Sequence, residues 1–148
     1  MPLTVKSVSL WRKEVVNQVG VLAQTLEPLA KAGANLRVLM GYRYPGDATK
    51  AAIELYPVEG KKVTAAATEG GLLASSIPAL IVEGDDKPGL GHAIAETISG
   101  ARVNMTFFVA QTIGRKFSAV LGFETEADAN TAAPLIKKAA ARKKSEKK

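Results

Sequence analysis

Residues 86–105 read DKPGLGHAIAETISGARVNM and residues 17–36 read NQVGVLAQTLEPLAKAGANL, and the two stretches align without a gap at an offset of 86 − 17 = 69 positions. Identical residues fall at matching places along the window: Gly20 with Gly89, Glu27 with Glu96, Ala32 with Ala101, and Asn35 with Asn104. Self-similarity at a fixed offset is the signature of an internal repeat. The sequence therefore predicts two copies of one small unit.

Each copy has the same predicted order of elements. Alternating apolar residues predict strands, and apolar residues three or four positions apart predict amphipathic helices. The order is strand, helix, strand, strand, helix, strand, although the second copy has only a lysine-rich segment in place of its last strand. The predicted segments are strands at 8–15, 35–42, 51–55 and 72–76 with helices at 22–30 and 59–69 in the first copy, and strands at 79–84, 103–111 and 117–123 with helices at 90–101 and from 126 onward in the second.

This order predicts an α+β fold of two ferredoxin-like βαββαβ units in tandem, with antiparallel sheets and helices on one face of each. We expect the first unit to span residues 1–76, the second residues 77–140, and a flexible lysine-rich tail residues 141–148. Pro28 and Pro134 fall inside predicted helices. Because proline removes a backbone donor, we expect a kink or an early end at both places.

Charge and composition narrow the functional classes. The net charge is +6, but residues 137–148 hold seven Lys or Arg and one Glu, which is a net charge of +6. Residues 1–136, the body of the chain, therefore have a net charge of 6 − 6 = 0. A basic end of this kind is typical of a solvated terminus. The absence of cysteine and the single histidine, His92, argue against a metal site. No motif places a general acid beside a base, so we expect neither an enzyme nor a cofactor.

Two further observations concern localisation. The N-terminus has no apolar signal region, and the most apolar stretch, residues 72–82, is too short to span a bilayer. The lack of cysteine suits a reducing compartment. We therefore expect a cytoplasmic protein without a membrane partner.

The segment Asp85-Asp86-Lys87-Pro88-Gly89-Leu90-Gly91, with Asn104 at the start of the next predicted strand, resembles an ACT domain. ACT domains begin with a strand, continue with a D-x-P-G turn that opens the first helix, and carry an Asn at the start of the second strand. The first copy departs from this pattern at its turn, because Asn17 replaces the Asp and Val19 replaces the Pro. The resemblance covers roughly residues 8–139.

The resemblance implies regulatory binding of small ligands, often amino acids, where two ACT units meet. The implied ligand-binding residues are Asp85, Asp86, Pro88, Gly89, Leu90, Gly91 and Asn104 in the second copy, and Asn17, Gln18, Gly20 and Asn35 in the first. Physical chemistry agrees, because a helix N-terminus attracts a carboxylate and an Asp accepts from an ammonium group. Tight turns also explain the glycines, and turn capping also explains the two asparagines.

The sequence thus predicts a regulatory protein that binds a small molecule, an amino acid, and that forms a homo-oligomer, most simply a homodimer. The second copy lacks its last strand, so the edge of residues 79–84 needs a cover. Residues 72–76 or a second molecule would supply it. Two alternatives stay open, namely a structural or adaptor module with a degenerate ligand site, and a weak nucleic-acid binder acting through the tail.

Overall fold

The computed structural model describes the backbone of residues 3–146 and the side chains of residues 3–139. The chain divides into two compact units. Residues 9–76 form one, which we call the inner unit, while Thr4–Val8 joins the residues from Ile77 onward in the other, the outer unit. Each unit is an antiparallel four-stranded sheet with two helices, so the α+β prediction of two ferredoxin-like units is confirmed.

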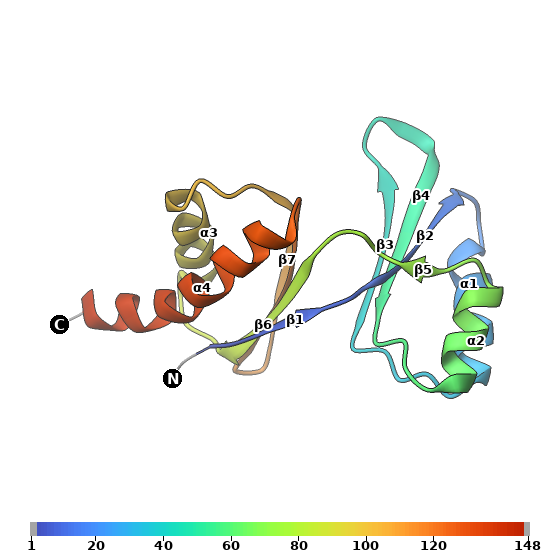
Figure 1. Ribbon diagram of the computed structural model, residues 1–148, viewed down its shortest axis with the longest axis horizontal. Helices are drawn as coiled ribbons and strands as arrows, with labels where there is room; N and C mark the ends of the chain where they lie inside the picture. The colour runs from blue at the N-terminus through green and yellow to red at the C-terminus, as the bar shows by residue number, and fades with distance from the viewer. Residues whose placement is uncertain (1–2, 147–148) are drawn as a thin grey trace. The chain divides into compact units, whose positions relative to one another are not determined.

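The inner unit follows the predicted order of elements. Its segments are β2 (Trp11–Val16), α1 (Val21–Lys31), β3 (Val38–Tyr44), β4 (Asp47–Tyr56), α2 (Lys61–Glu69) and the short β5 (Leu73–Ala74). The sheet order is β3-β4-β2-β5. Both helices cover one face of the sheet (Figure 1), where Leu29, Leu55, Val63 and Leu72 form the core.

The outer unit repeats this arrangement of elements. Its segments are β6 (Ala79–Asp85), α3 (Leu90–Gly100), β7 (Met105–Ile113), β8 (Lys116–Phe123) and α4 (Glu126–Glu146), joined by β1 (Thr4–Val8). The sheet order β1-β6-β8-β7 mirrors that of the inner unit. Ile94, Ile98, Leu121, Phe123 and Ile136 pack into one core beneath α3 and α4.

The edge of β6 is covered by β1, which pairs with it antiparallel from Thr4 opposite Glu83 to Val8 opposite Ala79. The expectation that residues 72–76 or a second molecule would cover this edge is therefore wrong. The predicted first strand at residues 8–15 is also wrong in its bounds, because β1 ends at Val8 and β2 begins at Trp11. The outer unit thus obtains its missing strand from the N-terminal end of the same chain.

The helices run through their prolines, contrary to the expected breaks. Pro28 lies inside α1, which continues to Lys31 and is 11 residues long, the same length as α3. Pro134 lies inside α4, whose backbone remains helical to Glu146. The segment expected to be a tail from residue 141 is therefore helical as far as residue 146, as its Ala, Lys and Arg residues favour.

Removal of residues 1–8 tests the role of β1. We expect the truncated chain to lose more than about 2 kcal/mol of stability, because Leu3 is 4% exposed and the loss of one buried leucine alone costs that much. Thermal unfolding measures the change, with a chain shortened by residues 143–148 as the control. Addition of a peptide of residues 1–10 should restore part of the lost melting temperature. An unchanged melting temperature would show that β1 contributes little.

Candidate functional site

The predicted binding turn of the outer unit is held against the β7–β8 hairpin. The Asp86 amide donates to the Arg115 carbonyl at 2.8 Å, and the Thr112 hydroxyl donates to Asp86 Oδ1 at 3.3 Å. Gly89 then adopts the left-handed conformation, with φ of 80°, and α3 begins at Leu90. Glycine suits this position because other residues are strained there. The hairpin therefore holds the turn at Asp86.

The inner unit builds the corresponding turn with different residues. The Asn17 amide donates to the Thr49 carbonyl at 2.8 Å, and the Asn17 side chain donates to the Ala48 carbonyl at 2.9 Å. The Gln18 carbonyl accepts from the Val21 amide, and Gly20 is left-handed with φ of 85°. The Asn17 side chain thus holds the turn in place, which favours a structural role for it.

The start of α3 leaves backbone donors exposed. No side chain caps either α1 or α3, and the first-turn amides have no acceptors within the helix. The first of them is bonded to the preceding turn in both units, Leu90 to the Lys87 carbonyl and Val21 to the Gln18 carbonyl, each at 3.2 Å. Gly91 lies in this first turn, where a side chain would meet no other atom within 4 Å. At the equivalent position of α1 stands Leu22, which is 39% exposed. The Leu22 side chain lies toward β3, where both of its Cδ atoms are 3.8 Å from the place that a Cβ of Gly41 would take.

Two predicted site residues are engaged elsewhere. Asp85 lies opposite Lys116 in the β6–β8 pair and forms an ion pair with it at 2.6 Å. The Lys116 ammonium group lowers the pKa of Asp85. The Leu90 side chain is 4% exposed and belongs to the outer core. The exposed Asp86 and Pro88, with Gly89 and Gly91, therefore remain as the accessible part of the predicted turn.

Asn104 lies away from this turn, at the other end of α3. An 11-residue helix is about 16 Å long, so the structure does not bring Asn104 and Gly91 together within one unit. The same holds for Asn35 and Gly20 at the two ends of α1. Asn104 is exposed and borders a hollow of about 340 Å³. The hollow is lined by Ala95, Ile98, Ser99, Arg102, Val103, Asn104 and Met105.

Arg102 in this hollow has an unusual backbone. Its φ is 58°, in the left-handed region, where the first copy has Gly33 with φ of 87° at the equivalent position. A residue with a side chain is strained in this conformation, and such strain is often found at functional sites. The sequence comparison contains this signal, because Arg replaces Gly between two otherwise matching stretches, but only the structure shows the strain.

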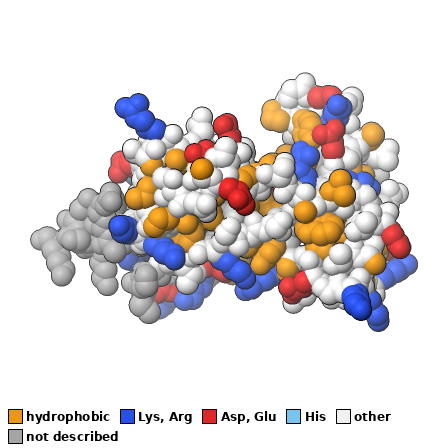
Figure 2. Space-filling model, viewed as in Figure 1, with side chains coloured by type: hydrophobic (Ala, Val, Ile, Leu, Met, Phe, Trp, Pro, Cys, Tyr) orange, Lys and Arg blue, Asp and Glu red, His pale blue; other side chains and the backbone are white. Residues whose placement is uncertain are grey.

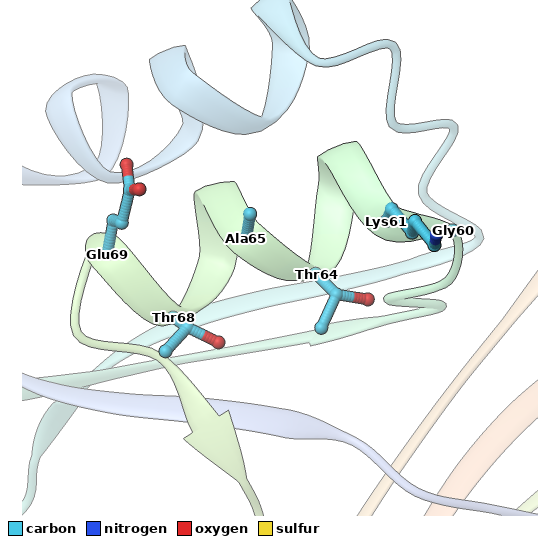
Figure 3. Close-up of a pocket in the computed structure, with 6 residues that line it drawn as sticks. All are labelled: Gly60, Lys61, Thr64, Ala65, Thr68 and Glu69. Atoms are coloured by element: carbon cyan, nitrogen blue, oxygen red, sulfur yellow. The ribbon is translucent and has the colours of Figure 1, made fainter.

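A second hollow, of about 710 Å³, lies along α2 of the inner unit and was not predicted. Figure 3 shows Thr64 and Thr68 projecting to one side of the helix, and Ala65 and Glu69 to the other. Gly60 and Lys61 complete its lining at the start of α2. Most of these side chains are exposed, so the feature is a shallow surface.

The sequence analysis also missed a polar network on the inner sheet, on the face opposite α1 and α2, which we call the open face. The Tyr42 hydroxyl donates to Glu54 Oε2 at 2.6 Å. Arg12 Nη2 donates to the Tyr44 hydroxyl at 2.5 Å, and that hydroxyl donates to Glu14 Oε2 at 2.5 Å. Burial and the bond to Glu54 raise the pKa of Tyr42 to about 12, so Tyr42 keeps its proton and remains a donor to Glu54.

Other features of the described residues restrict the function. Among residues 3–146 no three Cys, His, Asp or Glu lie close enough to hold a metal ion. His92 is exposed and lies 3.8 Å from Glu96 on the surface of α3. No helix in that range is long and apolar enough to cross a membrane. On the face shown in Figure 2, basic and acidic side chains are interspersed.

Comparison with known proteins identifies the fold. No protein-family model and no curated protein matches the sequence. A solved protein from Bacteroides thetaiotaomicron is similar, with a TM-score of 0.72 and 15% identity over 90% of this chain and 89% of that one. The regulatory subunit of aspartate kinase from Thermus thermophilus has a TM-score of 0.63 and 14% identity, over 94% and 97%. The corresponding subunit from Thermus flavus has a TM-score of 0.58 and 14% identity, also over 94% and 97%.

These similarities extend over almost the whole of each chain. The identities are low, and the comparison therefore defines the fold and not the ligand. The fold is ACT-like, as the turn around Gly89 predicted.

Replacement of Asp85 by Asn tests the ion pair beside the turn. The folded-state pKa of Asp85 is lowered, so its carboxylate stabilises the protein above the unfolded pKa of about 3.9. This contribution is lost as the pH falls through the lower, folded value. We expect the variant to melt slightly below the wild type at neutral pH and equally with it under strongly acidic conditions. Thermal unfolding over this pH range is the measurement, and a difference that grows toward acid would contradict the assignment.

Proposed function

We propose that this chain is a regulatory protein that binds an amino acid through the first turn of α3. The observation that carries the proposal is the pairing of uncapped amides with Gly91, whose lack of a side chain leaves them accessible. A ligand carboxylate would accept from these amides and interact favourably with the helix dipole. The exposed Asp86 uses Oδ1 for Thr112 and has a second oxygen for the ammonium group.

The hollow around Asn104 provides the second half of the proposed site. Ser99, Arg102 and Asn104 offer polar groups beside the apolar Ile98 and Met105, a combination typical of small-ligand sites. Because the hollow and the Gly91 turn lie at opposite ends of α3, one outer unit cannot apply both to the same ligand. We therefore propose that a second copy of the chain supplies the other half. A homo-oligomer is then part of the function.

The edge of β7 supports an association of this kind. β7 is nine residues long, lies at the edge of the outer sheet, and contains no charged residue or proline that would block pairing. Val109 is 49% exposed and Ile113 is 68% exposed. Antiparallel pairing of β7 with β7 of a second copy would centre on Val109. This argument replaces the one based on β6, whose edge is already covered by β1.

Two alternatives make different predictions. An adaptor with a degenerate site would associate through β7 but would bind no amino acid. A nucleic-acid binder would lose retention when the lysine-rich end is removed and would show strong salt dependence. The neutral body of the chain favours the amino-acid proposal over the second alternative.

A screen of the common amino acids by thermal shift, followed by isothermal titration of those that raise the melting temperature, tests ligand binding. Gly91→Leu gives the outer unit the residue that the inner unit has at Leu22. We expect it to weaken binding at the turn by at least about tenfold, since a charge-assisted hydrogen bond contributes about 1.5–3 kcal/mol. This position is preferable to Gly89, whose φ of 80° would strain any other residue.

The matched control is Leu22→Gly, which should not reduce binding at α3. Binding that is unaffected by Gly91→Leu would place the ligand elsewhere. The absence of a shift with every amino acid would favour the adaptor.

Val109→Lys tests the proposed association. In a twofold β7 pair the two introduced lysines would lie near each other, and like charges across a strand pair are unfavourable. We expect the wild type to sediment as a dimer and the variant to shift toward the 15.5 kDa monomer. Val16→Lys is the control, because Val16 is 65% exposed but lies on β2, inside the inner sheet. A monomeric wild type at micromolar concentration would contradict the proposal.

A further inference from the structure

The polar network on the open face leaves two charged side chains incompletely bonded. Arg12 Nε and Glu54 Oε1 are buried and have no hydrogen-bond partner among the described residues. Glu54 is 0% exposed. A buried charged group without a partner for each polar atom is strongly unfavourable. An explanation is therefore needed for why both residues are present.

The two unpaired atoms belong to residues that face each other. Arg12 of β2 lies directly opposite Glu54 of β4 in the strand pairing, with Met40 of β3 opposite Glu54 on the other side. Both side chains contribute to the network on the open face, in which Tyr42 and Tyr44 also lie. One unpaired atom is a hydrogen-bond donor on a cation and the other is an acceptor on an anion. A molecule that bonds to both atoms must carry a negatively charged hydrogen-bond acceptor and a positively charged hydrogen-bond donor.

The outer unit shows what the same sheet position contains when it has no such pair. There Ile81 lies opposite Val120, which lies opposite Val109. These three residues correspond in register to Arg12, Glu54 and Met40. Val120 is 6% exposed, so the equivalent position is also buried. Replacement of charged side chains at buried positions by well-packed apolar residues is often neutral or stabilising. Stability of the sheet therefore does not explain Arg12 and Glu54.

We propose that Arg12 and Glu54 form a binding site for a zwitterionic small molecule of the α-amino acid class. The ligand carboxylate accepts from Arg12 Nε, and the ligand ammonium group donates to Glu54 Oε1. This site is separate from the α3 turn, and it stands whether or not that turn binds a ligand. It assigns a binding function to the inner unit.

The surroundings of the pair indicate a preference among ligands. Tyr42 is 38% exposed, and its hydroxyl donates to the other carboxylate oxygen of Glu54, Oε2. The rings of Tyr42 and Tyr44 are stacked with centroids 6.4 Å apart and form an aromatic wall. Arg12, Glu14 and Glu54 together carry a net charge of 1 − 2 = −1. The site therefore favours an amino acid with a cationic side chain, such as lysine or arginine, over glutamate.

The experiment uses the full chain and the variant Arg12→Ile/Glu54→Val, which gives the inner sheet the residues of the outer one. Isothermal titration is carried out with lysine, arginine, glutamate and leucine, and with the Nα-acetyl and methyl ester derivatives of lysine. We expect the wild type to bind lysine or arginine, and each derivative to bind at least about tenfold more weakly because it lacks one of the two charged groups. We expect the double variant to lose this binding while its melting temperature stays the same or rises.

Two further variants separate the possible outcomes. Glu54→Gln keeps the shape of the side chain and should weaken binding without a change in melting temperature. Gly91→Leu should leave binding at Arg12 and Glu54 intact, so loss of all binding in this variant alone would favour the α3 turn and overturn the present proposal. A double variant that melts several degrees below the wild type would assign the pair to the fold. Unaltered binding in that variant, or no binding of any probe by the wild type, would also overturn the proposal.

Discussion

The pairing of β1 with β6 is the constraint on which the rest of the chain depends. Val8 lies opposite Ala79, so the chain leaves the outer sheet and returns to it at adjacent points. Between these points the inner unit begins and ends with another antiparallel contact, in which Trp11 of β2 lies opposite Ala74 of β5. The inner unit is therefore an insertion between two neighbouring strands of the outer sheet. The insertion completes both sheets, because each obtains a fourth strand.

This topology shows how far sequence reasoning could go. The internal repeat predicted the positions of the first helix of each unit well. α1 and α3 are both 11 residues long and begin at positions that differ by 90 − 21 = 69. Helices depend on contacts three and four residues apart, which a local pattern contains. The partner of β6 could not be found in this way, because Thr4–Val8 and Ala79–Asp85 are far apart in the chain and strand pairing is non-local. The low helix propensity of proline predicted a break at Pro28, but α1 continues beyond it, with Leu29 buried against the sheet.

The candidate site, like the fold, could be predicted only in part from the sequence. The sequence predicted turns at Gly20 and Gly89, and the structure shows that both glycines adopt the left-handed conformation. The ion pair of Asp85 could not be predicted from the sequence, because it depends on the strand register that places Lys116 opposite Asp85. Asn17 is another such case, because its side chain bonds to a hairpin 31 residues away. Composition and spacing thus identified the turn, and only the pairing of strands showed which of its polar groups are already occupied.

The duplication makes each unit a natural comparison for the other. The sheets agree in strand order, so residues at equivalent positions can be compared directly. Gly91 stands where the inner unit has Leu22, and Arg102 where it has Gly33; conversely, Arg12 and Glu54 stand where the outer unit has Ile81 and Val120. Each unit thus contains one place with an unfavourable residue. In the outer unit it is a strained arginine beside a hollow, and in the inner unit it is the pair Arg12 and Glu54, each with one buried atom that has no hydrogen-bond partner.

Such residues have a thermodynamic consequence for a binding protein. A ligand that binds only the folded state stabilises it by about 2.7 kcal/mol at a concentration of 100 Kd. That gain is comparable with the penalty of about 1–3 kcal/mol for one buried polar group without a partner. A ligand that satisfied Arg12 Nε and Glu54 Oε1 would therefore offset the instability that these residues introduce. The unliganded inner sheet would then be the less stable form, with Tyr42 bonded to only one of the two Glu54 oxygens.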